Sequence, residues 1–381
     1  MHDSTVTLFL CGDVMLGRGV DQILPHPGDP ELREGWLADS RSYVELAERA
    51  NGPIPRPVPF AWPWGAALPI LDEAAPDVRV VNLETAVTGD GEFAPGKAVH
   101  YRMNPANLPC LAQVRPDVCV LANNHVLDFG RAGLDDTLQA LSDAGLRTAG
   151  AGRDADEAGR PAAVPVGEGR RVLVFGCGST CSGIPDGWAA AEGRPGVHLL
   201  PDLSDRTADE LTARIRQARR PGDVTVVSVH WGSNWGYEVP AEQVRFAHRL
   251  VDGGVDVIHG HSSHHPRPVE VYRDRLVLYG CGDFVDDYEG ITGYEAYRDD
   301  LRLIYLVSVD ADTGALRGLR MIPLQARWMR LWPADPGDVD WLRAVLDRVC
   351  ARFGAQFAAE PDGAISLLLP ERQQAVKTAG S

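Results

Sequence analysis

The stretch VTLFLCGDVMLGR at residues 6–18 decides how the rest of the chain can be interpreted. Its first half is an apolar run with the length of a buried β-strand. Asp13 follows that run directly, at the point where the strand should end. In open α/β sheets, ligands bind at the carboxyl ends of the strands. The stretch therefore predicts a buried strand that presents a functional carboxylate at its end.

Similar apolar runs alternate with segments of helical period through much of the chain. Further strands are predicted at residues 77–84, 117–125, 171–178, 223–232 and 256–261. Helices are predicted at about residues 131–144, 204–219 and 241–252. This alternation is typical of an α/β sheet with helices on its faces, so the expected fold class is α/β.

The C-terminal part of the sequence has a different pattern. Two hairpins are predicted at residues 269–284 and 300–324, as an antiparallel extension of the same sheet, and a final helix near residues 339–352. We expect residues 1–370 to form a single domain and residues 371–381 to form a disordered tail. Residues 25–64 are rich in Pro and Trp without a clear period, which predicts a long loop that covers the site.

Composition excludes several classes of protein. Of the 381 residues, 44% are hydrophobic and 24% are charged, which argues against wholesale disorder. No apolar stretch approaches the roughly 18 residues of a membrane span, and the N-terminus does not resemble a secretory signal, so no membrane partner is expected. The seven cysteines contain no repeated CxxC pair. Free thiols in a reducing cytoplasm are therefore expected, with Cys177 and Cys181 as candidate redox partners.

The charge balance limits the partners and cofactors further. The formal net charge is −16, from 37 basic and 53 acidic residues. Such a field repels a phosphate backbone, so nucleic acid is not an expected partner. The only lysines are Lys97 and Lys377, and Lys377 lies close to the end of the chain. Pyridoxal phosphate needs a lysine for its Schiff base, so this cofactor is not expected.

Polar clusters follow the apolar runs at the ends of the predicted strands. They are GDVMLGR at residues 12–18, NLE at 82–84, ANNHVLDFG at 122–130, VHWG at 229–232 and HGHSSHHP at 259–266. Packing does not require so many Asp, Glu, Asn and His residues at strand ends. These residue types are ligands of divalent metals, so a shared metal site is predicted.

Together with GDF at residues 282–284, these motifs resemble the CapA family, which is named for poly-γ-glutamate capsule synthesis. The resemblance covers about residues 6–305. It implies the fold of the calcineurin-like metallophosphatases, a sheet sandwich with flanking helices, and an acid/base role for His125. The metal ligands that the resemblance implies are Asp13, Glu84, Asn124, His230, His261 and His264.

Several positions differ from the pattern of the calcineurin-like phosphatases. Met15 stands where their DxH motif has its histidine, and NLE supplies one acid where their GDxxD motif has two. Both differences argue against a tightly held metal pair. The motif GHSSHHP leaves open whether His264 or His265 points inward. Asp283 stands in GDF where the family commonly has asparagine, which adds a carboxylate.

The expected cofactor is a divalent metal ion. Oxygen ligands from Asp13, Glu84 and Asn124 suit Ca²⁺, Mg²⁺ or Mn²⁺, whereas His230 and His261 suit Zn²⁺, Fe²⁺ or Mn²⁺. We therefore expect Ca, Mn or Zn, and the oxygen-rich ligand set favours Ca or Mn.

Histidines with nearby carboxylates predict acid–base chemistry. A carboxylate that holds one ring nitrogen fixes the tautomer and raises the basicity of the other nitrogen. Two such pairs facing one carbon can remove a proton from one face and return it to the other, which is epimerisation. For Asp128, capping of the helix that follows it is the alternative role. The predicted catalytic residues are Asp13, His125, Asp128, His264, His265 and Asp283.

The resemblance also suggests a substrate. Within the family, soluble lasso-peptide epimerases invert the C-terminal residue of a ribosomally made precursor peptide, and by analogy we expect this reaction here. The peptide carboxylate would pair with the metal or with one of three arginines. These arginines are Arg18, Arg102 and Arg298. The tryptophans expected to line a pocket for the peptide end are Trp231, Trp235, Trp62 and Trp64.

Three other functions remain open from the sequence. They are a metal-dependent phosphoesterase, a hydrolase of γ-glutamyl or other peptide polymers, and a non-catalytic protein of a polymer-assembly complex. The sequence predicts no particular oligomeric state.

Overall fold

The strand predicted at residues 6–13 is present as β1 (Thr5–Val14) in the computed structural model, which describes residues 5–167 and 169–369. β1 lies inside a ten-stranded sheet, parallel to β2 (Val78–Leu83) and antiparallel to β17 (Leu301–Asp310). The order of the main path is β20-β21-β18-β17-β1-β2-β5-β6, and β16 and β19 pair with β1 and β18. The other strands of this sheet are β5 (Val118–Val120), β6 (Arg147–Ala149), β16 (Asp283–Val285), β18 (Leu316–Ala326), β19 (Leu331–Pro333), β20 (Phe357–Ala359) and β21 (Ile365–Leu367).

A second sheet has seven strands in the order β11-β9-β12-β13-β15-β14, with β8 paired to β9. Its strands are β8 (Ala162–Val166), β9 (Arg170–Ser179), β11 (Leu199–Leu200), β12 (Val224–His230), β13 (Val257–His261), β14 (Val269–Tyr272) and β15 (Arg275–Leu278). β9, β12 and β13 run parallel to one another, as expected for strands joined by helical crossovers, and β15 runs parallel to β13. Two short ribbons pair β3 (Ala86–Val87) with β4 (Arg102–Met103) and β7 (Ala151–Gly152) with β10 (Gly196–Val197).

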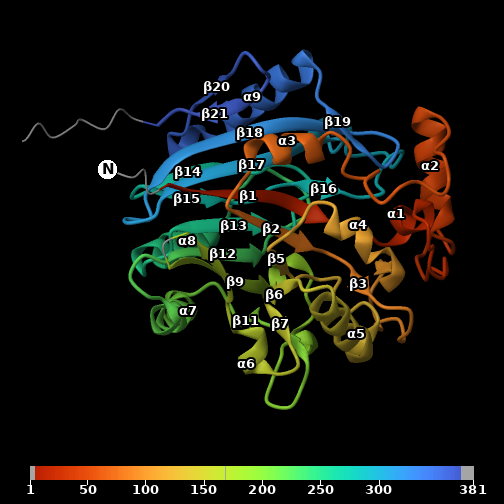
Figure 1. Cartoon of the computed structure of the whole chain (residues 1–381), viewed down its shortest axis with the longest axis horizontal. Coiled ribbons are helices and arrows are strands. Elements are labelled where there is room, and N and C mark those ends of the chain that lie inside the picture. The colour runs from red at the N-terminus through yellow and green to blue at the C-terminus, as the bar shows by residue number, and fades with distance from the viewer. Residues whose placement is uncertain (1–4, 168, 370–381) are drawn as a thin grey trace, which may run out of the picture.

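The two sheets pack face to face, and helices cover both outer faces (Figure 1). The core between the sheets contains side chains from both, such as Leu10 of β1 and Val226 of β12. On β1, Leu8 and Leu10 point into this core, whereas Phe9 and Cys11 belong to the core under the helices of the first sheet. A strand that is buried on both faces needs apolar residues at consecutive positions, which explains the unbroken apolar run.

Helices of the N-terminal half, such as α1 and α5, pack on the first sheet, and α7 and α8 pack on the second. The helices are α1 (Arg18–Ile23), α2 (Arg41–Asn51), α3 (Ala67–Ala74), α4 (Leu108–Ala112), α5 (Gly130–Asp143), α6 (Ala155–Ala158), α7 (Asp205–Ala218), α8 (Ala241–Asp252) and α9 (Pro336–Cys350). Short 3₁₀ turns lie at Pro105–Asn107, Thr180–Ser182, Asp186–Trp188, Glu295–Tyr297 and Ala351–Phe353. The helices predicted from periodicity correspond to α5, α7, α8 and α9, and the expected α/β class is confirmed.

Two expectations about the chain path are wrong. The predicted hairpins do not extend one sheet: β14 and β15 belong to the second sheet, whereas β17 and β18 belong to the first. The residues after β15 cross over and form β16, which pairs parallel with β1. The segment at residues 25–64 is not all loop, because it contains α2, whose buried side chains are Tyr43, Val44 and Ala47.

Other expectations are tested only in part. Within the described residues, no helix is both long enough and apolar enough to cross a membrane. All seven cysteines are free, so Cys177 and Cys181 form no disulfide. The predicted tail at residues 371–381 lies outside the described residues. The single domain and the cytoplasmic location stay predictions.

Candidate metal centre

The polar strand ends of the two sheets meet at one place. In the strand register, Asp13 is paired with Asn82 of β2 and with Asp283 of β16, and His230 is paired with His261. A Cβ atom on Gly12 would lie 1.8 Å from the carbonyl oxygen of Gly282, so only glycine allows β16 to approach β1 this closely. The fold therefore brings together clusters that are far apart in the sequence.

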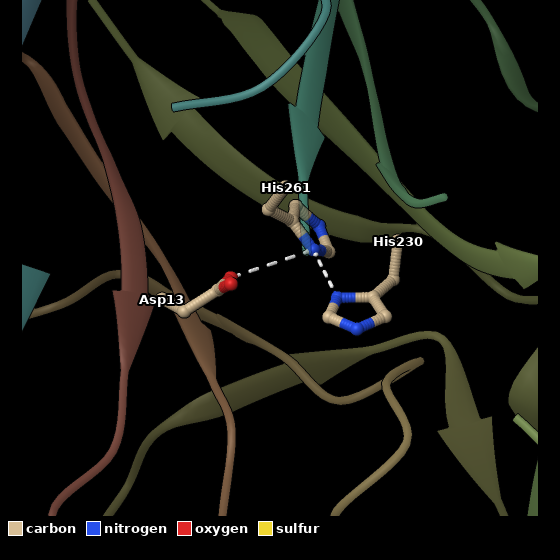
Figure 2. Close-up of side chains that lie close together, drawn as sticks. All are labelled: Asp13, His230 and His261. Atoms are coloured by element: carbon tan, nitrogen blue, oxygen red, sulfur yellow. Dashed lines mark hydrogen bonds and ion pairs between the residues drawn. The ribbon is translucent and has the colours of Figure 1, made fainter. Parts of the chain in front are cut away.

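Asp13, His230 and His261 form the middle of this site (Figure 2). The Nδ1 atom of His261 lies 3.8 Å from Oδ1 of Asp13 and 2.8 Å from Nδ1 of His230. All three side chains are buried, and each offers an atom within 4.8 Å of the others. One carboxylate oxygen and two imidazole nitrogens at such distances form a donor set suited to a divalent cation.

Asn82, near the end of β2, and Glu84, directly after β2, add two polar side chains to the site. Oε1 of Glu84 lies 3.8 Å from Nε2 of His230 and 3.9 Å from Nε2 of His125. The side-chain amide of Asn82 donates hydrogen bonds to Oδ1 of Asp13, at 2.7 Å, and to Oε2 of Glu84, at 3.1 Å. One amide group therefore fixes the positions of both buried carboxylates.

Two asparagines after β5 support the same arrangement. Oδ1 of Asn124 lies 2.9 Å from Nε2 of His230, so the predicted amide ligand is at the site. Asn123 donates to Oδ1 of Asn82 at 3.1 Å, and its own Oδ1 accepts from the backbone N–H of His125 at 3.1 Å. Asn123 thus links the orientation of Asn82 to the position of His125.

The electrostatics of this cluster fit a bound cation. Burial and the charge of Asp283 raise the pKa of Asp13 to about 7. Burial and the charge of Asp13 raise the pKa of Glu84 well above its usual value. Burial lowers the pKa values of His230 and His261 well below the usual value for histidine. Buried carboxylates that repel one another, beside neutral imidazoles, are the donors that a divalent ion stabilises.

The loop after β13 carries backbone strain at the site. Ser262 follows His261 with a φ angle of 99°, in the region that favours glycine. Its backbone N–H donates to Oδ2 of Asp13 at 3.1 Å. Strained conformations of non-glycine residues occur preferentially at functional sites, where surrounding contacts hold them in place.

His264 and Asp283 form a pair on one side of Asp13. Nδ1 of His264 lies 2.9 Å from Oδ1 of Asp283, and both side chains offer atoms within 4.8 Å of an Asp13 oxygen. Burial lowers the pKa of His264, but the charge and hydrogen bond of Asp283 outweigh it, so the net shift is upward. The Oδ2 atom of Asp283 is buried without a hydrogen-bond partner, which leaves it available to a ligand.

His264, and not His265, faces the centre. Nε2 of His265 accepts a hydrogen bond from the backbone N–H of Gly236 at 3.1 Å, and its ring stacks on Tyr297. Its Nδ1 contacts the carbonyl oxygen of Pro266 at 3.1 Å, so both ring nitrogens meet backbone atoms and neither meets the carboxylate that its predicted catalytic role requires.

His125 and Asp128 form a second pair, on the side of Glu84. Nδ1 of His125 lies 2.6 Å from Oδ2 of Asp128, which also accepts from the backbone N–H of Tyr101 at 2.7 Å. Lys97 forms an ion pair with Oδ1 of Asp128 and contacts the carbonyl oxygen of Asn124. Burial lowers the pKa of His125 to about 4, so its imidazole is neutral at pH 7. Burial raises the pKa of Asp128, but His125 and Lys97 lower it by more.

The alternative role of Asp128 as a helix cap is wrong. Phe129 occupies the N-cap position of α5, and no side chain caps this helix end. The side chain of Asp128 is used entirely by His125, Lys97 and the backbone of Tyr101.

Two tyrosines form a chain of contacts between the two histidine–carboxylate pairs. The ring of Tyr101 packs edge-on against His125, with ring centroids 4.5 Å apart, and its hydroxyl donates to that of Tyr288 at 3.1 Å. The hydroxyl of Tyr288 lies 3.5 Å from Nε2 of His264. Both tyrosines are therefore part of the site, although neither was predicted from the sequence.

The three arginines expected to bind a substrate carboxylate are all close to acids. Arg18 is buried and paired with Asp287, at 2.8 Å, and with Glu34, at 3.0 Å. Arg298 pairs with Asp300 at 2.7 Å and with Asp338 at 2.8 Å, and Arg102 lies 3.8 Å from Asp29. The structure therefore supports none of them as a free carboxylate anchor.

Of the tryptophans predicted to line a pocket, only Trp235 lies at the site, with its ring 5.3 Å from that of His264. Trp231 is fully buried and stacks on Tyr279. Trp62 and Trp64 donate hydrogen bonds to backbone carbonyls of Trp328 and Cys110, in the core under the helices.

The sequence contained signals for some of the residues that were missed. Asn82 and Asn123 lie inside the motifs NLE and ANNH, where only their neighbours were assigned roles. Lys97 is the only lysine among the described residues, and it was considered only as a Schiff-base residue. Tyr101 and Tyr288 had no motif that could have identified them.

Comparisons with known proteins show the family to which the chain belongs. The family described as bacterial capsule synthesis protein PGA_cap matches residues 7–288. A probable polyglutamine synthesis accessory protein of Mycobacterium tuberculosis is 54% identical over 368 residues, which cover 96% of this chain and 97% of the relative. The PGA biosynthesis protein CapA of Bacillus subtilis is 27% identical over 304 residues, covering 80% and 68%. A solved phosphatase structure from Mycoplasma pneumoniae aligns with a TM-score of 0.44 and 11% identity, over 84% of this chain and 94% of that one.

Proposed function

Because the chain belongs to the bacterial capsule synthesis protein family PGA_cap, as its motifs indicated, we propose that it is a metal-dependent enzyme that acts on a peptide-like substrate. The names of two relatives support this substrate class, since one refers to polyglutamine synthesis and the other to PGA biosynthesis. The finer proposal is inversion of the Cα centre of a peptide's C-terminal residue.

The observation that carries the proposal is the pair of histidine–carboxylate contacts on two sides of one centre. His125 with Asp128 lies beside Glu84, and His264 with Asp283 lies beside Asp13. In both pairs, the carboxylate engages Nδ1. Among the described residues, Nε2 of His125 has no hydrogen bond, and Nε2 of His264 has only the 3.5 Å contact with the hydroxyl of Tyr288. Two positioned acid–base groups are the requirement for a proton exchange that uses two faces of one carbon.

The residues that would hold the metal are Asp13, His230 and His261, with Glu84 and Asn124 close by. When bound, a divalent ion supplies a positive charge that stabilises negative charge developing on a substrate oxygen.

The environments of the two histidines favour different proton states. His125 is neutral at pH 7 and can accept a proton at Nε2, whereas Asp283 favours the protonated form of His264. Such divergent environments identify a base and an acid. In the proposed step, His125 takes the Cα proton and His264 delivers its Nε2 proton to the opposite face of the same carbon. The Cα–H bond and the Nε2–H bond of His264 break while a new Cα–H bond and an Nε2–H bond on His125 form, and no other bond of the substrate is broken. His125 then loses a proton to water and His264 regains one, which restores both starting states.

Hydrolysis of a phosphate ester or a peptide bond is the second candidate. It is favoured by a separate observation: Asp13 belongs to both groups of metal-binding side chains, the one with His230 and His261 and the one with His264 and Asp283. A carboxylate shared by two groups suits a pair of metal ions, which is the arrangement of many hydrolases. In that case His264 would be a ligand and not an acid. The word "accessory" in a relative's name leaves a non-catalytic assembly role as the third candidate.

Isotope exchange separates these candidates. The metal-loaded protein is incubated in D₂O with a tetraglutamate peptide and with peptides that end in an apolar residue, and the products are analysed by mass spectrometry. One deuterium at the C-terminal Cα without cleavage, abolished by EDTA, is the expected result. Cleaved peptide without exchange, or release of phosphate from p-nitrophenyl phosphate, would favour the hydrolase instead.

A further inference from the structure

An aromatic stack extends from the candidate acid–base site towards the surface. Trp235, in the loop after β12, and Tyr294, in the segment after β16, stack face to face with ring centroids 3.9 Å apart and planes at 5°. The ring centroid of Trp235 also lies 5.3 Å from that of His264. A flat aromatic surface therefore begins at the histidine that we propose as the acid.

This stack forms one wall of a cavity of about 420 Å³, which His264 and Tyr288 also line. The volume is within the range of roughly 300–1,000 Å³ that is typical of small-molecule sites. Much of the remaining lining is apolar and comes from α2, the loop before it and neighbouring loops. These apolar side chains are Trp36, Leu37, Leu46, Val99 and Ile291.

Two aromatic rings of the cavity lining are unusually exposed. Only three large hydrophobic side chains are strongly exposed among the described residues, and two of them, Trp36 at 62% and Tyr294 at 36%, line this cavity. Apolar side chains that are exposed together commonly mark a binding site. The burial of such rings by a partner contributes more to binding than most polar contacts.

The charges around the cavity disfavour an acidic ligand. The guanidinium of Arg18 lines it, but two carboxylates, Asp287 and Glu34, already pair with this single cation. Asp299 adds another carboxyl group to the lining. His264 is paired with Asp283. A carboxylate side chain that entered would meet acids without an uncommitted cation among the described lining residues.

We propose that this cavity binds a large apolar side chain, preferably aromatic, of the peptide residue on which the site acts. The inference rests on the proposed function and names its substrate class. It also predicts a preference that differs from a polymer of glutamate, because the cavity offers stacking surfaces and no partner for a carboxylate.

Calorimetric titration tests this preference without turnover, so its outcome is separate from that of isotope exchange. The probes are the peptides acetyl-Gly-Gly-Trp, acetyl-Gly-Gly-Glu and acetyl-Gly-Gly-Lys, titrated into the full chain with and without Mn²⁺. We expect the Trp peptide to bind at least about tenfold more tightly than the Glu peptide, and Trp36→Ala and Tyr294→Ala each to weaken its binding about 3–10-fold. Because both residues are exposed, their replacement should leave the fold intact, and circular dichroism checks that it does.

The matched control is Trp332→Ala, a change at a half-buried tryptophan of β19 that does not line the cavity. This variant should bind the Trp peptide as the unmodified protein does. Equal or tighter binding of the Glu peptide would overturn the proposal, as would an unchanged affinity for the Trp peptide in both cavity variants. Tightest binding of the Lys peptide would show that the rings recognise a cation, which also overturns it.

Discussion

The side-chain amide of Asn82 donates a hydrogen bond of 2.7 Å to Oδ1 of Asp13, and both side chains are fully buried. The same amide donates to Glu84, so a neutral group holds two mutually repelling carboxylates together. Contacts of this kind orient the side chains that bind a metal.

Replacement of Asn82 by alanine should therefore weaken metal binding. We expect Asn82→Ala to lower the affinity for Mn²⁺ by about 10–100-fold, the usual effect of removing a group that orients a ligand. Titration calorimetry with the chelator-treated protein measures this change. Asn107→Ala is the matched control, because Asn107 is equally buried but binds Asp21 and the backbone of His26. Equal Mn²⁺ affinities for the two variants would contradict the role of Asn82.

His125 should be required for turnover but not for metal binding. Its Nδ1 is held by Asp128, and its Nε2 is 3.9 Å from Glu84, so it lies beside the proposed donors and not among them. His125→Ala should lower the rate of Cα exchange from the L peptide by roughly 10²–10⁴-fold with metal content retained. The rate and the metal content are measured on the same sample. An unchanged rate would refute the role, and loss of the metal would make His125 a ligand.

Removal of the second histidine should affect the two stereoisomers differently. In a two-base reaction, each base abstracts the proton from only one enantiomer of the substrate residue. His264→Gln should therefore retain abstraction from the L peptide and lose it from the D peptide, whereas His125→Ala should show the reverse. Initial rates of solvent deuterium uptake are followed from both peptides. Equal losses from both stereoisomers in each variant would be inconsistent with two separate bases.

Acid stability should depend on Asp310, at the end of β17. Burial raises the pKa of Asp310, but hydrogen bonds from Thr313 and Arg317 outweigh it and lower the pKa from 3.8 to about 2. A carboxyl group whose pKa is lower in the folded state stabilises the protein above its unfolded pKa, and this contribution is lost as the pH falls through about 2. Asp310→Asn should thus reduce Tm at pH 6 and have little effect near pH 2. A constant difference in Tm across this range would contradict the expectation.

The sequence allowed prediction of the elements that depend on local pattern. The apolar run of β1 and the periodic segments of α7 and α8 were identified because burial on two faces or on one stripe leaves a readable pattern. Sheet membership could not be predicted in the same way. The pairing of β16 with β1 depends on a close approach of the two backbones at Gly12. The residues around Asp283 show no local pattern from which this pairing could be predicted.

In the candidate site too, some residues could be predicted from local pattern, whereas others depend on contacts that only the fold creates. Asp13, Glu84, His230 and His261 were predicted because each is a polar residue at the end of an apolar strand. Lys97 lies in a loop, and its ion pair with Asp128 could not be predicted because only the fold brings the two residues together. The choice between His264 and His265 likewise depends on which ring the aromatic residues of neighbouring loops enclose.

Metal content is the measurement that tests the central claim most directly. The protein is stripped with a chelator, incubated with Mn²⁺, Ca²⁺ or Zn²⁺, desalted, and analysed by inductively coupled plasma mass spectrometry beside Asp13→Asn, His230→Ala and His248→Ala. His248 is the control, because it stacks on Tyr272 and contacts Glu270, and neither residue belongs to the candidate metal centre. We predict at least one divalent ion per chain for the unmodified protein and His248→Ala, and a large loss for the other two variants with circular dichroism unchanged. No stoichiometric metal in the unmodified protein, or equal metal in all four proteins, would contradict the account.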